Sequence, residues 1–512
     1  MTVLSSKDSI KGYTLFAIAF ACSLFIPSLI YSLRRDPIFA DAIHKPYSYP
    51  PMVKYSYKWP DISSFTHGVP AIANATEEND IYKEIDQRYC GQDRCRFLLP
   101  IAITEQESKA QLHFRQLAFL AGKIDRTIVL PNVYSSHMGS CLPHPFSFYY
   151  DLKWLNDNTK HFNYITMEDF KAWLLERHYA GVIPSGQEIY MQGSRKSRLL
   201  KNIKNCFSDS FDFSGRPTVS YQLQDHQNQR HINITDIMVD LFSDKARQHE
   251  YLDGMIQSPF PGAAKKFKVH TDASSPPVDV INLFYDRRYK FINDHDAQAP
   301  LPYSQRWVDV ANQISNQLKP YMAIHWRMER LEPVSNLLPC AMDLIDKVHQ
   351  LTIDNNEQKY PNVFLLTDYP HLINATGARP ESNSFRMSEL KNEHHQAIQY
   401  LYQHLNISLT SVNNNKIPYN ELPSDNWHIL PINASSDDSL LPADRSILGI
   451  VDKLVAMNAQ WFFAGRPGVC AKSSSFTGRI SNSRHQAFKH GDENIKMPVK
   501  TFDMKKTQPA QD

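Results

Sequence analysis

The sequence has almost no net charge, because 55 lysines and arginines stand against 53 aspartates and glutamates in 512 residues. That balance gives no reason to expect a nucleic acid or an acidic partner, since such partners are held by concentrated basic charge. It also gives no sign of disorder, and an aromatic content of 12% fits a packed globular chain. The length allows two or three domains.

Cysteines are few, and none is arranged like a zinc ligand. Outside an apolar segment near the N-terminus there are six, which form no C-x-x-C pair and do not sit beside paired histidines. An even set of this kind is typical of disulfides formed in an oxidising compartment. The six are Cys90, Cys95, Cys141, Cys206, Cys340 and Cys470.

Long apolar runs are also scarce, and the clearest is Tyr13 to Leu33, which carries no charge. At the rise of an α-helix it spans roughly 31 Å, about one bilayer core. A cleaved signal peptide is the alternative, but its apolar core should be shorter and be followed by a small-x-small site. We therefore expect a cytosolic tail over 1–12 and a membrane helix over 13–33.

Glycosylation sequons indicate on which side of the membrane the body lies. Five N-x-S/T sequons follow the apolar segment, which favours a lumenal body and a glycoprotein. They begin at Asn74, Asn233, Asn374, Asn406 and Asn433. Residues 34–88 are rich in Pro, Ser and Tyr without sustained periodicity, so we expect a stem there and a folded body that begins near Arg88.

The body opens with a strand–helix–strand pattern. Phe97 to Ile103 is a buried-strand run, a helix extends to about Lys123 with Thr104 or Ser108 as its N-cap, and a second strand ends at Pro131. Such a unit begins a doubly wound parallel sheet in an α/β fold. We assign 89–305 to this first Rossmann-like domain.

A second alternating series of strands and helices fills 306–498, before a polar tail over 499–512 that we expect to be mobile. The expected strands are 321–324, 362–367, 407–412 and 461–464, and the expected helices are 340–351, 390–405 and 445–458.

The strand at 321–324 ends in His325-Trp326-Arg327-Met328-Glu329. Ligands of open α/β sheets bind at the carboxyl ends of strands, and side chains two residues apart share a face. His325 and Arg327 can therefore point at one ligand, and the planar guanidinium suits phosphate oxygens. The alternative is a surface salt bridge between Arg327 and Glu329.

A second polar motif follows the strand at 461–464. Gly465 and Gly468 indicate a turn, and Lys472-Ser-Ser-Ser-Phe-Thr477 then reads as the start of a helix. Backbone N–H groups and hydroxyls at a helix N-terminus form an anion site.

In their order and separation, the H-x-R strand end, the SSSFT helix start and the VFLLTD strand between them resemble the GDP-fucose protein O-fucosyltransferase-like family. The segment R-T-I-V-L-P, Arg126 to Pro131, resembles the same family. The resemblance implies a GT-B fold, in which two Rossmann-like domains face each other across a cleft. It also implies an enzyme that transfers fucose from GDP-fucose with inversion. We expect no metal or other cofactor, because the sequence has no persuasive D-x-D motif.

The resemblance gives the donor-site residues their expected roles. Arg327 would stabilise charge on the β-phosphate, His325 and Asp368 would contact the nucleoside, and Asp452 is a weaker candidate. The helix start would hold the diphosphate through Ser474, Ser475, Phe476 and Thr477.

The loop after the first strand departs from the family, because ITEQESKAQ stands where many members have a Gly-rich turn. Glu105 or Glu107 could serve as the base that accepts the acceptor's proton. The alternative is that both stabilise the helix N-terminus as first-turn carboxylates. Asp294-His295-Asp296 is the metal–nucleotide signature of a different glycosyltransferase fold, but it does not follow a clear strand.

The sequence therefore predicts a single-pass type II membrane protein of the Golgi or ER with a lumenal transferase domain. Its partners would be a GDP-sugar donor and a hydroxyl of a protein or glycan acceptor. Two alternatives stay open: an inactive lumenal carbohydrate-binding or scaffolding protein with this fold, and a transferase for another nucleotide sugar.

Overall fold

The computed structural model describes the body of the chain from Ala75, where a compact unit begins. The described residues are 75–192, 206–207, 210–214, 219–222, 278–286, 295–354, 362–374, 377–380, 385, 387–411, 416–418, 427–432, 444 and 446–505. The expected cytosolic tail, the expected membrane helix and most of the expected stem lie outside the described residues. Asn74, Asn233, Asp294 and Asn433 also lie outside them. Within the described ranges, no helix is long and apolar enough to cross a membrane.

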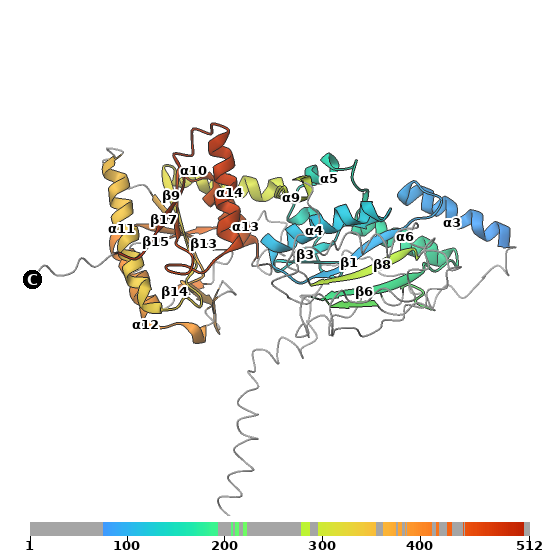
Figure 1. The fold of residues 1–512 in the computed structure, drawn as a ribbon, viewed down its shortest axis with the longest axis horizontal. Coiled ribbons are helices and arrows are strands. Elements are labelled where there is room, and N and C mark those ends of the chain that lie inside the picture. Colours follow the sequence, from blue (N-terminus) through green and yellow to red (C-terminus); the bar gives the residue numbers. More distant parts are fainter. Residues whose placement is uncertain are drawn as a thin grey trace, which may run out of the picture. The chain divides into compact units, whose positions relative to one another are not determined.

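The first sheet contains parallel strands in the order β5-β2-β1-β8-β6-β7, and a β3–β4 hairpin pairs antiparallel with the end of β1 (Figure 1). The expected strand β1 is confirmed with the predicted bounds. The strands are β1 (Phe97–Ile103), β2 (Thr127–Val129), β3 (Asn132–Tyr134), β4 (His137–Gly139), β5 (Tyr164–Ile165), β6 (Gly186–Gln192), β7 (Val219–Gln222) and β8 (Val280–Asp286).

Helices cover both faces of this sheet, which is why β1 is apolar along its length rather than alternating. Leu98 and Ile103 pack with α4, whereas Phe97, Leu99 and Ile101 pack with α6 and α3. The helices of this part are α3 (Ala75–Cys90), α4 (Glu107–Lys123), η2 (Phe146–Phe148), α5 (Lys153–Asp157), α6 (Met167–Tyr179) and α9 (His295–Gln298).

The folded body begins at helix α3, from Ala75, and not near Arg88 as expected. Its buried Asp86 accepts hydrogen bonds from the N–H of Cys95 (2.8 Å) and the indole of Trp173 (2.7 Å), and it is paired with Arg177. Because these partners lie in the segment before β1 and in α6, residues 75–88 belong to the body and not to an extended stem.

The second sheet has the order β15-β13-β10-β9-β16-β17, and every neighbouring pair is parallel. Its strands are β9 (Tyr321–Trp326), β10 (Asn362–Thr367), β13 (Ile407–Ser411), β15 (Trp427–Pro431), β16 (Trp461–Gly465) and β17 (Met497–Phe502). Strand β17 overturns the expectation that the tail is mobile from residue 499, because Phe502 is fully buried at the edge of the sheet.

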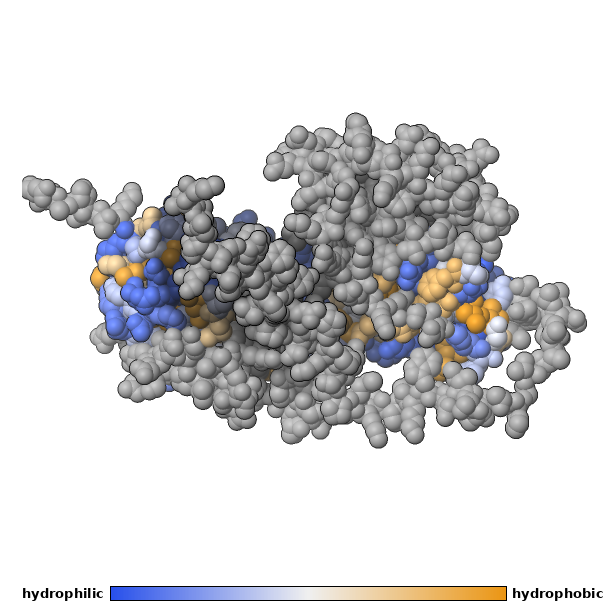
Figure 2. All heavy atoms as spheres, turned by 90° about the horizontal axis from the view of Figure 1, so that it is seen from below, coloured by the Kyte–Doolittle hydropathy of each residue, from blue (hydrophilic) through white to orange (hydrophobic). Residues whose placement is uncertain are grey.

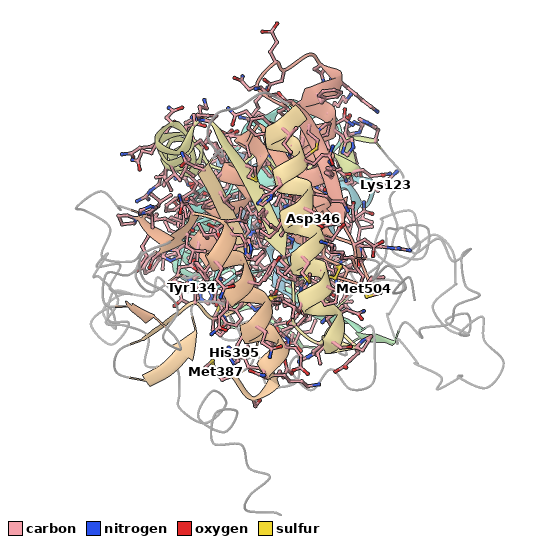
Figure 3. The ribbon with its side chains drawn as sticks, turned by 90° about the vertical axis from the view of Figure 1, so that its left-hand side faces the viewer. Lys123, Tyr134, Asp346, Met387, His395 and Met504 are labelled. Carbon is pink, nitrogen blue, oxygen red and sulfur yellow. A yellow bond between two sulfur atoms is a disulfide. The ribbon has the colours of Figure 1, made fainter. Side chains whose placement is uncertain are left out.

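Side chains of β9 alternate between two apolar layers. Met322 and Ile324 pack with α11 and α12, whereas Tyr321 and Ala323 pack with α10 and α13. Figure 3 shows α11 and α12 side by side over the sheet, with Asp346 on α11 and His395 on α12. The helices are α10 (Gln305–Leu318), α11 (Leu337–Asp354), α12 (Asn392–His404), α13 (Ser446–Asn458) and α14 (Ser475–Lys489).

Smaller elements lie between these helices and strands. Strands β12, β11 and β14 form a separate antiparallel sheet. The short elements are η6 (Val334–Asn336), β11 (Leu372–Asn374), β12 (Gly377–Pro380), η7 (Met387–Glu389) and β14 (Lys416–Pro418).

All six expected cysteines are paired. The disulfides are Cys90–Cys95, Cys141–Cys206 and Cys340–Cys470. The first is the small loop next to β1, and the third joins segments 130 residues apart in the sequence. The prediction that these six cysteines form disulfides is confirmed.

The described surface shows no single dominant apolar face in the view of Figure 2, where hydrophilic and hydrophobic residues are interspersed over the coloured part. The exposed large hydrophobic side chains come from separate segments. They are Tyr179, Ile183, Ile353, Ile429, Phe488 and Met504.

Candidate functional site

His325 stands at the carboxyl end of β9, between β10 and β16 in the middle of the second sheet. Its imidazole stacks on the ring of Phe476 at 5.0 Å and is hydrogen-bonded through Nδ1 to Oγ1 of Thr477 at 2.8 Å. Burial, together with the nearby charge of Arg327, lowers the pKa of His325 to about 3, so the ring is neutral. The two sequence motifs therefore meet at this strand end.

Arg327 and Glu329 form an ion pair, which is the alternative interpretation of this motif. The pair is more than a surface contact, because the Glu329 side chain is 4% exposed and also accepts from Nζ of Lys472 at 3.1 Å. Arg327 itself is 27% exposed and so reaches solvent. One buried carboxylate thus holds two cations, one from each motif.

Asp368 fixes the loop that carries these residues. Its carboxylate follows β10 and accepts from the backbone N–H of Met328 at 2.8 Å and of Glu329 at 3.0 Å. Burial raises the pKa of Asp368 to about 6, against the effect of these two bonds. The geometry gives Asp368 a positioning role, and its contact with a nucleoside stays a prediction.

Helix α14 begins at Ser475, as the motif predicts. Ser474 is its N-cap, and its hydroxyl accepts from the N–H of Phe476 at 3.2 Å. The hydroxyl of Thr477 is occupied by His325, whereas the side chains of Ser474 and Ser475 reach the surface. The first-turn N–H groups of α14 therefore lie beside the end of β9, as an anion site requires.

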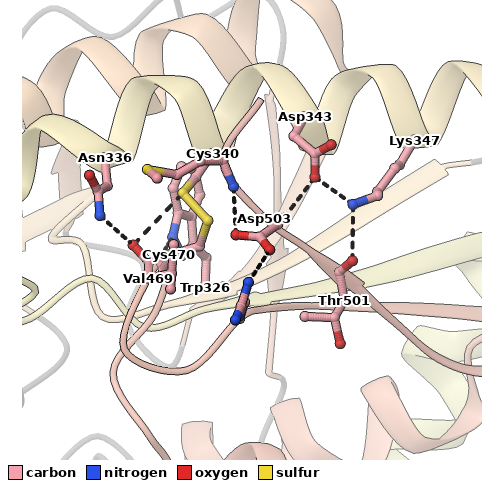
Figure 4. Close-up of a disulfide and its surroundings, with 11 residues drawn as sticks. Trp326, Asn336, Cys340, Asp343, Lys347, Val469, Cys470, Thr501 and Asp503 are labelled. Atoms are coloured by element: carbon pink, nitrogen blue, oxygen red, sulfur yellow. Dashed lines mark hydrogen bonds and ion pairs between the residues drawn. A yellow bond between two sulfur atoms is a disulfide. The ribbon is translucent and has the colours of Figure 1, made fainter. Parts of the chain in front are cut away.

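The loop between β16 and α14 is tethered both to α11 and to the end of β9 (Figure 4). The disulfide joins Cys470 to Cys340 on α11, and the carbonyl of Cys470 accepts from the indole of Trp326 at 2.7 Å. Two residues later, the N–H of Lys472 donates to the carbonyl of Arg327 at 3.0 Å. The position of the helix start relative to the strand end is thus set by covalent and hydrogen bonds.

Glu107, one of the two expected bases, is buried in an ion pair with Lys453 of α13. It also accepts from the hydroxyls of Tyr303 (2.9 Å) and Tyr150 (3.2 Å) and from the amide of Gln111 (3.1 Å). Burial acts to raise the pKa of Glu107, but Lys453 and the hydroxyls outweigh it and leave that pKa below its ordinary value. A carboxylate held this way is a poor proton acceptor, so this geometry favours the structural alternative.

Glu105, the other expected base, lies in the loop after β1 with its side chain 3.5 Å from Nζ of Lys109. The expected N-caps Thr104 and Ser108 are wrong, because α4 begins after Gln106 without a side-chain cap. Ser108 instead donates to Glu107 at 3.0 Å. Glu105 thus stays a candidate base.

Asp452 accepts a hydrogen bond from the hydroxyl of Thr410 on β13. Its neighbour Lys453 contacts Glu107 and Ser108 of α4 instead, so the two residues serve different contacts. Asp296 lies in α9, 3.8 Å from Nε2 of His161 and 4.0 Å from Nζ of Lys160. In the described part of the chain, no group of His, Cys, Asp or Glu is placed to hold a metal ion.

Sequence reasoning missed three residues that the geometry brings into the site: Glu329 as a shared counter-ion, Lys472 and Lys453. The signal for Lys472 was its position two residues before the N-cap Ser474. No local pattern connects Lys453 to Glu107, which precedes it by 346 residues.

Comparisons with known proteins place fucosyltransferases among the similar structures. No family model and no curated protein matches the chain. POFUT1 in complex with GDP, and with GDP-fucose, matches with a TM-score of 0.38 and 14% identity over 80% of this chain and 98% of that chain. The fucosyltransferase NodZ from Bradyrhizobium matches with a TM-score of 0.28 and 10% identity, over 76% and 93%.

The matched proteins carry the same class of name, fucosyltransferase, as the family that the sequence motifs resemble. Because the TM-scores are below 0.5, no residue role is taken from those proteins.

Proposed function

We propose that the chain is an inverting glycosyltransferase that moves fucose from GDP-fucose to a hydroxyl of a protein or glycan. The observation that carries the proposal is the meeting of Arg327, His325 and the N-terminus of α14 at one strand end. A guanidinium beside a helix N-terminus suits a diphosphate, which is the leaving group of a nucleoside diphosphate sugar. In the proposed arrangement the two sheets belong to two GT-B domains.

In the proposed reaction, the bond between fucose and the β-phosphate breaks as the acceptor oxygen attacks from the opposite face. Negative charge grows on the β-phosphate, and Arg327 and the first turn of α14 bind that charge more strongly as it develops. An interaction that strengthens in the transition state is one that accelerates reaction. The acceptor's proton would pass to Glu105, because Glu107 is already bound to Lys453.

One observation favours a second candidate, a carbohydrate-binding protein that no longer transfers sugar. Glu107 is engaged by Lys453, Tyr303 and Tyr150, so one of the two expected bases is removed from chemistry. Such a protein would bind GDP-fucose or a glycan without turnover. We propose a Golgi or ER membrane as the location for either candidate.

The two candidates are separated by incubating the full-length protein in detergent with GDP-fucose and measuring GDP release. A transferase should release GDP by slow hydrolysis without acceptor, and faster when an acceptor glycoprotein mixture is added. Binding of GDP-fucose without any release of GDP would support the binding protein. Neither binding nor release would end the donor assignment.

A further inference from the structure

The carboxylate of Glu329 joins two cations that come from separate parts of the chain. Its Oε1 atom contacts Nη2 of Arg327, in the loop after β9, and lies 3.1 Å from Nζ of Lys472, in the loop before α14. A hydrogen bond between backbone groups also joins these two loops, because the N–H of Lys472 donates to the carbonyl of Arg327 at 3.0 Å. Arg327 and Lys472 are therefore neighbours through both side chains and main chain.

Glu329 is held in place from its own main chain as well. Its N–H donates to Asp368 at 3.0 Å, and the preceding Met328 N–H donates to the same carboxylate. On the other side, the Cys340–Cys470 disulfide anchors the loop two residues before Lys472. The three charged groups thus have little freedom to separate.

Exposure distinguishes the carboxylate from its two partners. Glu329 is buried at 4%, whereas Arg327 is 27% and Lys472 36% exposed. An anion that approaches from solvent therefore meets the two cations and not the carboxylate behind them. The buried Asp368 carboxylate lies behind the same loop, so the cluster as a whole is not strongly positive, but its charged groups nearest solvent are the two cations.

Donor groups remain on both cations after Glu329 is satisfied. Guanidinium and ammonium groups each carry several N–H donors, and Glu329 contacts Arg327 through Nη2. Among the described residues, Nε and Nη1 of Arg327 and the other ammonium hydrogens are left for a ligand. Two cations side by side match the two phosphates of a nucleoside diphosphate.

We propose that Lys472 is a second diphosphate-binding cation, paired with Arg327, and that Glu329 is the positioning residue that orients both. The proposal rests on the proposed function, since it concerns the same donor site. Glu329 would stay bound to both cations while they bind the donor, so that their positions are set before the donor arrives.

The role of Lys472 is tested by binding of GDP and of inorganic pyrophosphate to the full-length protein, measured by calorimetry. Lys472→Ala should weaken both ligands roughly 10- to 100-fold, the effect of one charge-assisted hydrogen bond. Lys472→Arg should restore most of the affinity. The matched control is Lys347→Ala, which breaks another lysine–carboxylate pair, with Asp343 at 2.5 Å (Figure 4).

The control variant should bind both ligands as the wild type does. If Lys472→Ala also binds them as the wild type does, the role of Lys472 is wrong, although the proposed function stands. If the wild-type protein binds neither GDP nor pyrophosphate, both proposals fail.

The positioning role of Glu329 predicts a separation of binding from turnover. Glu329→Gln removes a negative charge near the anion site, so GDP affinity should be unchanged or higher. The cations lose their common anchor, so kcat should fall at least about tenfold, as expected when an oriented charged contact is lost. If Glu329 is purely structural, Glu329→Gln should lower the melting temperature and leave kcat per folded molecule unchanged. That result would overturn the positioning role.

Discussion

Glu107 on α4 and Lys453 on α13 form an ion pair in which the side chains are only 7% and 2% exposed. The first residue belongs to the helix after β1 of the first sheet, and the second belongs to a helix packed on the second sheet. The ammonium also lies 5.2 Å from the ring of Phe476, which stacks on His325. This buried ion pair therefore lies next to Phe476 of the candidate donor site.

Breaking this pair should destabilise the protein strongly. Glu107→Gln or Lys453→Met alone leaves a buried charge without its partner, and the expected loss is about 3–5 kcal/mol of unfolding free energy. The double variant should recover much of that loss. Chemical denaturation measures all three, with Lys153→Ala as the control: it breaks an exposed pair with Asp157 and should change stability little.

Turnover of the same variants tests the alternative that Glu107 is the catalytic base. If Glu107 is the catalytic base, Glu107→Gln should abolish turnover while leaving stability nearly intact. The opposite pattern, a large stability loss with turnover retained per folded molecule, is the expected result.

Arg327 should matter more for the rate than for stability, because buried Glu329 keeps Lys472 as a partner when the guanidinium is changed. Arg327→Lys keeps the charge but loses the planar pair of donors, so transfer should fall roughly 100- to 1,000-fold, by analogy with deleted oxyanion donors. Arg327→Ala should be at least as slow. Rates and melting temperatures are measured together. Wild-type turnover in Arg327→Ala would remove this residue from the proposed chemistry.

Transfer should not require a divalent metal, because Arg327 and the N-terminus of α14 supply positive charge to the diphosphate. Activity is measured before and after EDTA treatment and dialysis. Full activity after chelation is the expected outcome. Loss of activity that manganese restores would direct attention to Asp294 and Asp296 instead.

The raised pKa of Asp368 predicts a pH dependence of stability. Its folded-state value of about 6 exceeds the ordinary 3.8, so between these pH values the native chain holds a proton that the unfolded chain has lost. This contribution to stability therefore declines as pH rises from about 4 to about 6. His325 and His371, whose pKa values burial lowers to about 3, act in the opposite direction.

Comparison with Asp368→Asn isolates the effect of this one carboxyl from those of the histidines. The stability of the wild type relative to the variant should fall between pH 4 and pH 6 and stay level above pH 7. Melting temperatures at several pH values measure it. Parallel curves for the two proteins would show that the carboxyl titrates normally.

The expected topology predicts a lumenal, glycosylated body. Among the sequons in the described residues, Asn406 is exposed just before β13. Glycosidase treatment should reduce the apparent mass of the expressed protein, and protease added to sealed microsomes should leave the body intact. Digestion of the body in intact microsomes would contradict the type II arrangement.

Local signals in the sequence predicted those elements that carry their own pattern. The apolar runs of β1, β9 and β10, and the serines that begin α14, were placed to within a few residues. Strand β8, VINLFYD, is as apolar as β1, but it is flanked by segments without a regular helical pattern and was missed. Its place between β1 and β6 depends on pairing between distant residues.

The candidate site was predicted as two motifs but not as a set of contacts. His325 and Arg327 were found because two residues on one strand share a face. That Glu329 binds both Arg327 and Lys472 could not be read from the sequence, since 143 positions separate the carboxylate from the lysine. The disulfide that brings their loops together is equally non-local.

The order of β9 and β16 along the chain has a consequence for synthesis. Strand β9 ends at residue 326, but the neighbour that covers one of its edges, β16, is not translated until residues 461–465. Throughout that interval a largely apolar strand has an unpaired edge, which is a template for pairing with other chains. A premature stop before residue 461 should therefore yield an aggregating product and not merely an inactive one. During synthesis, the edge of β9 is protected from pairing with other chains only after nearly the whole chain has left the ribosome.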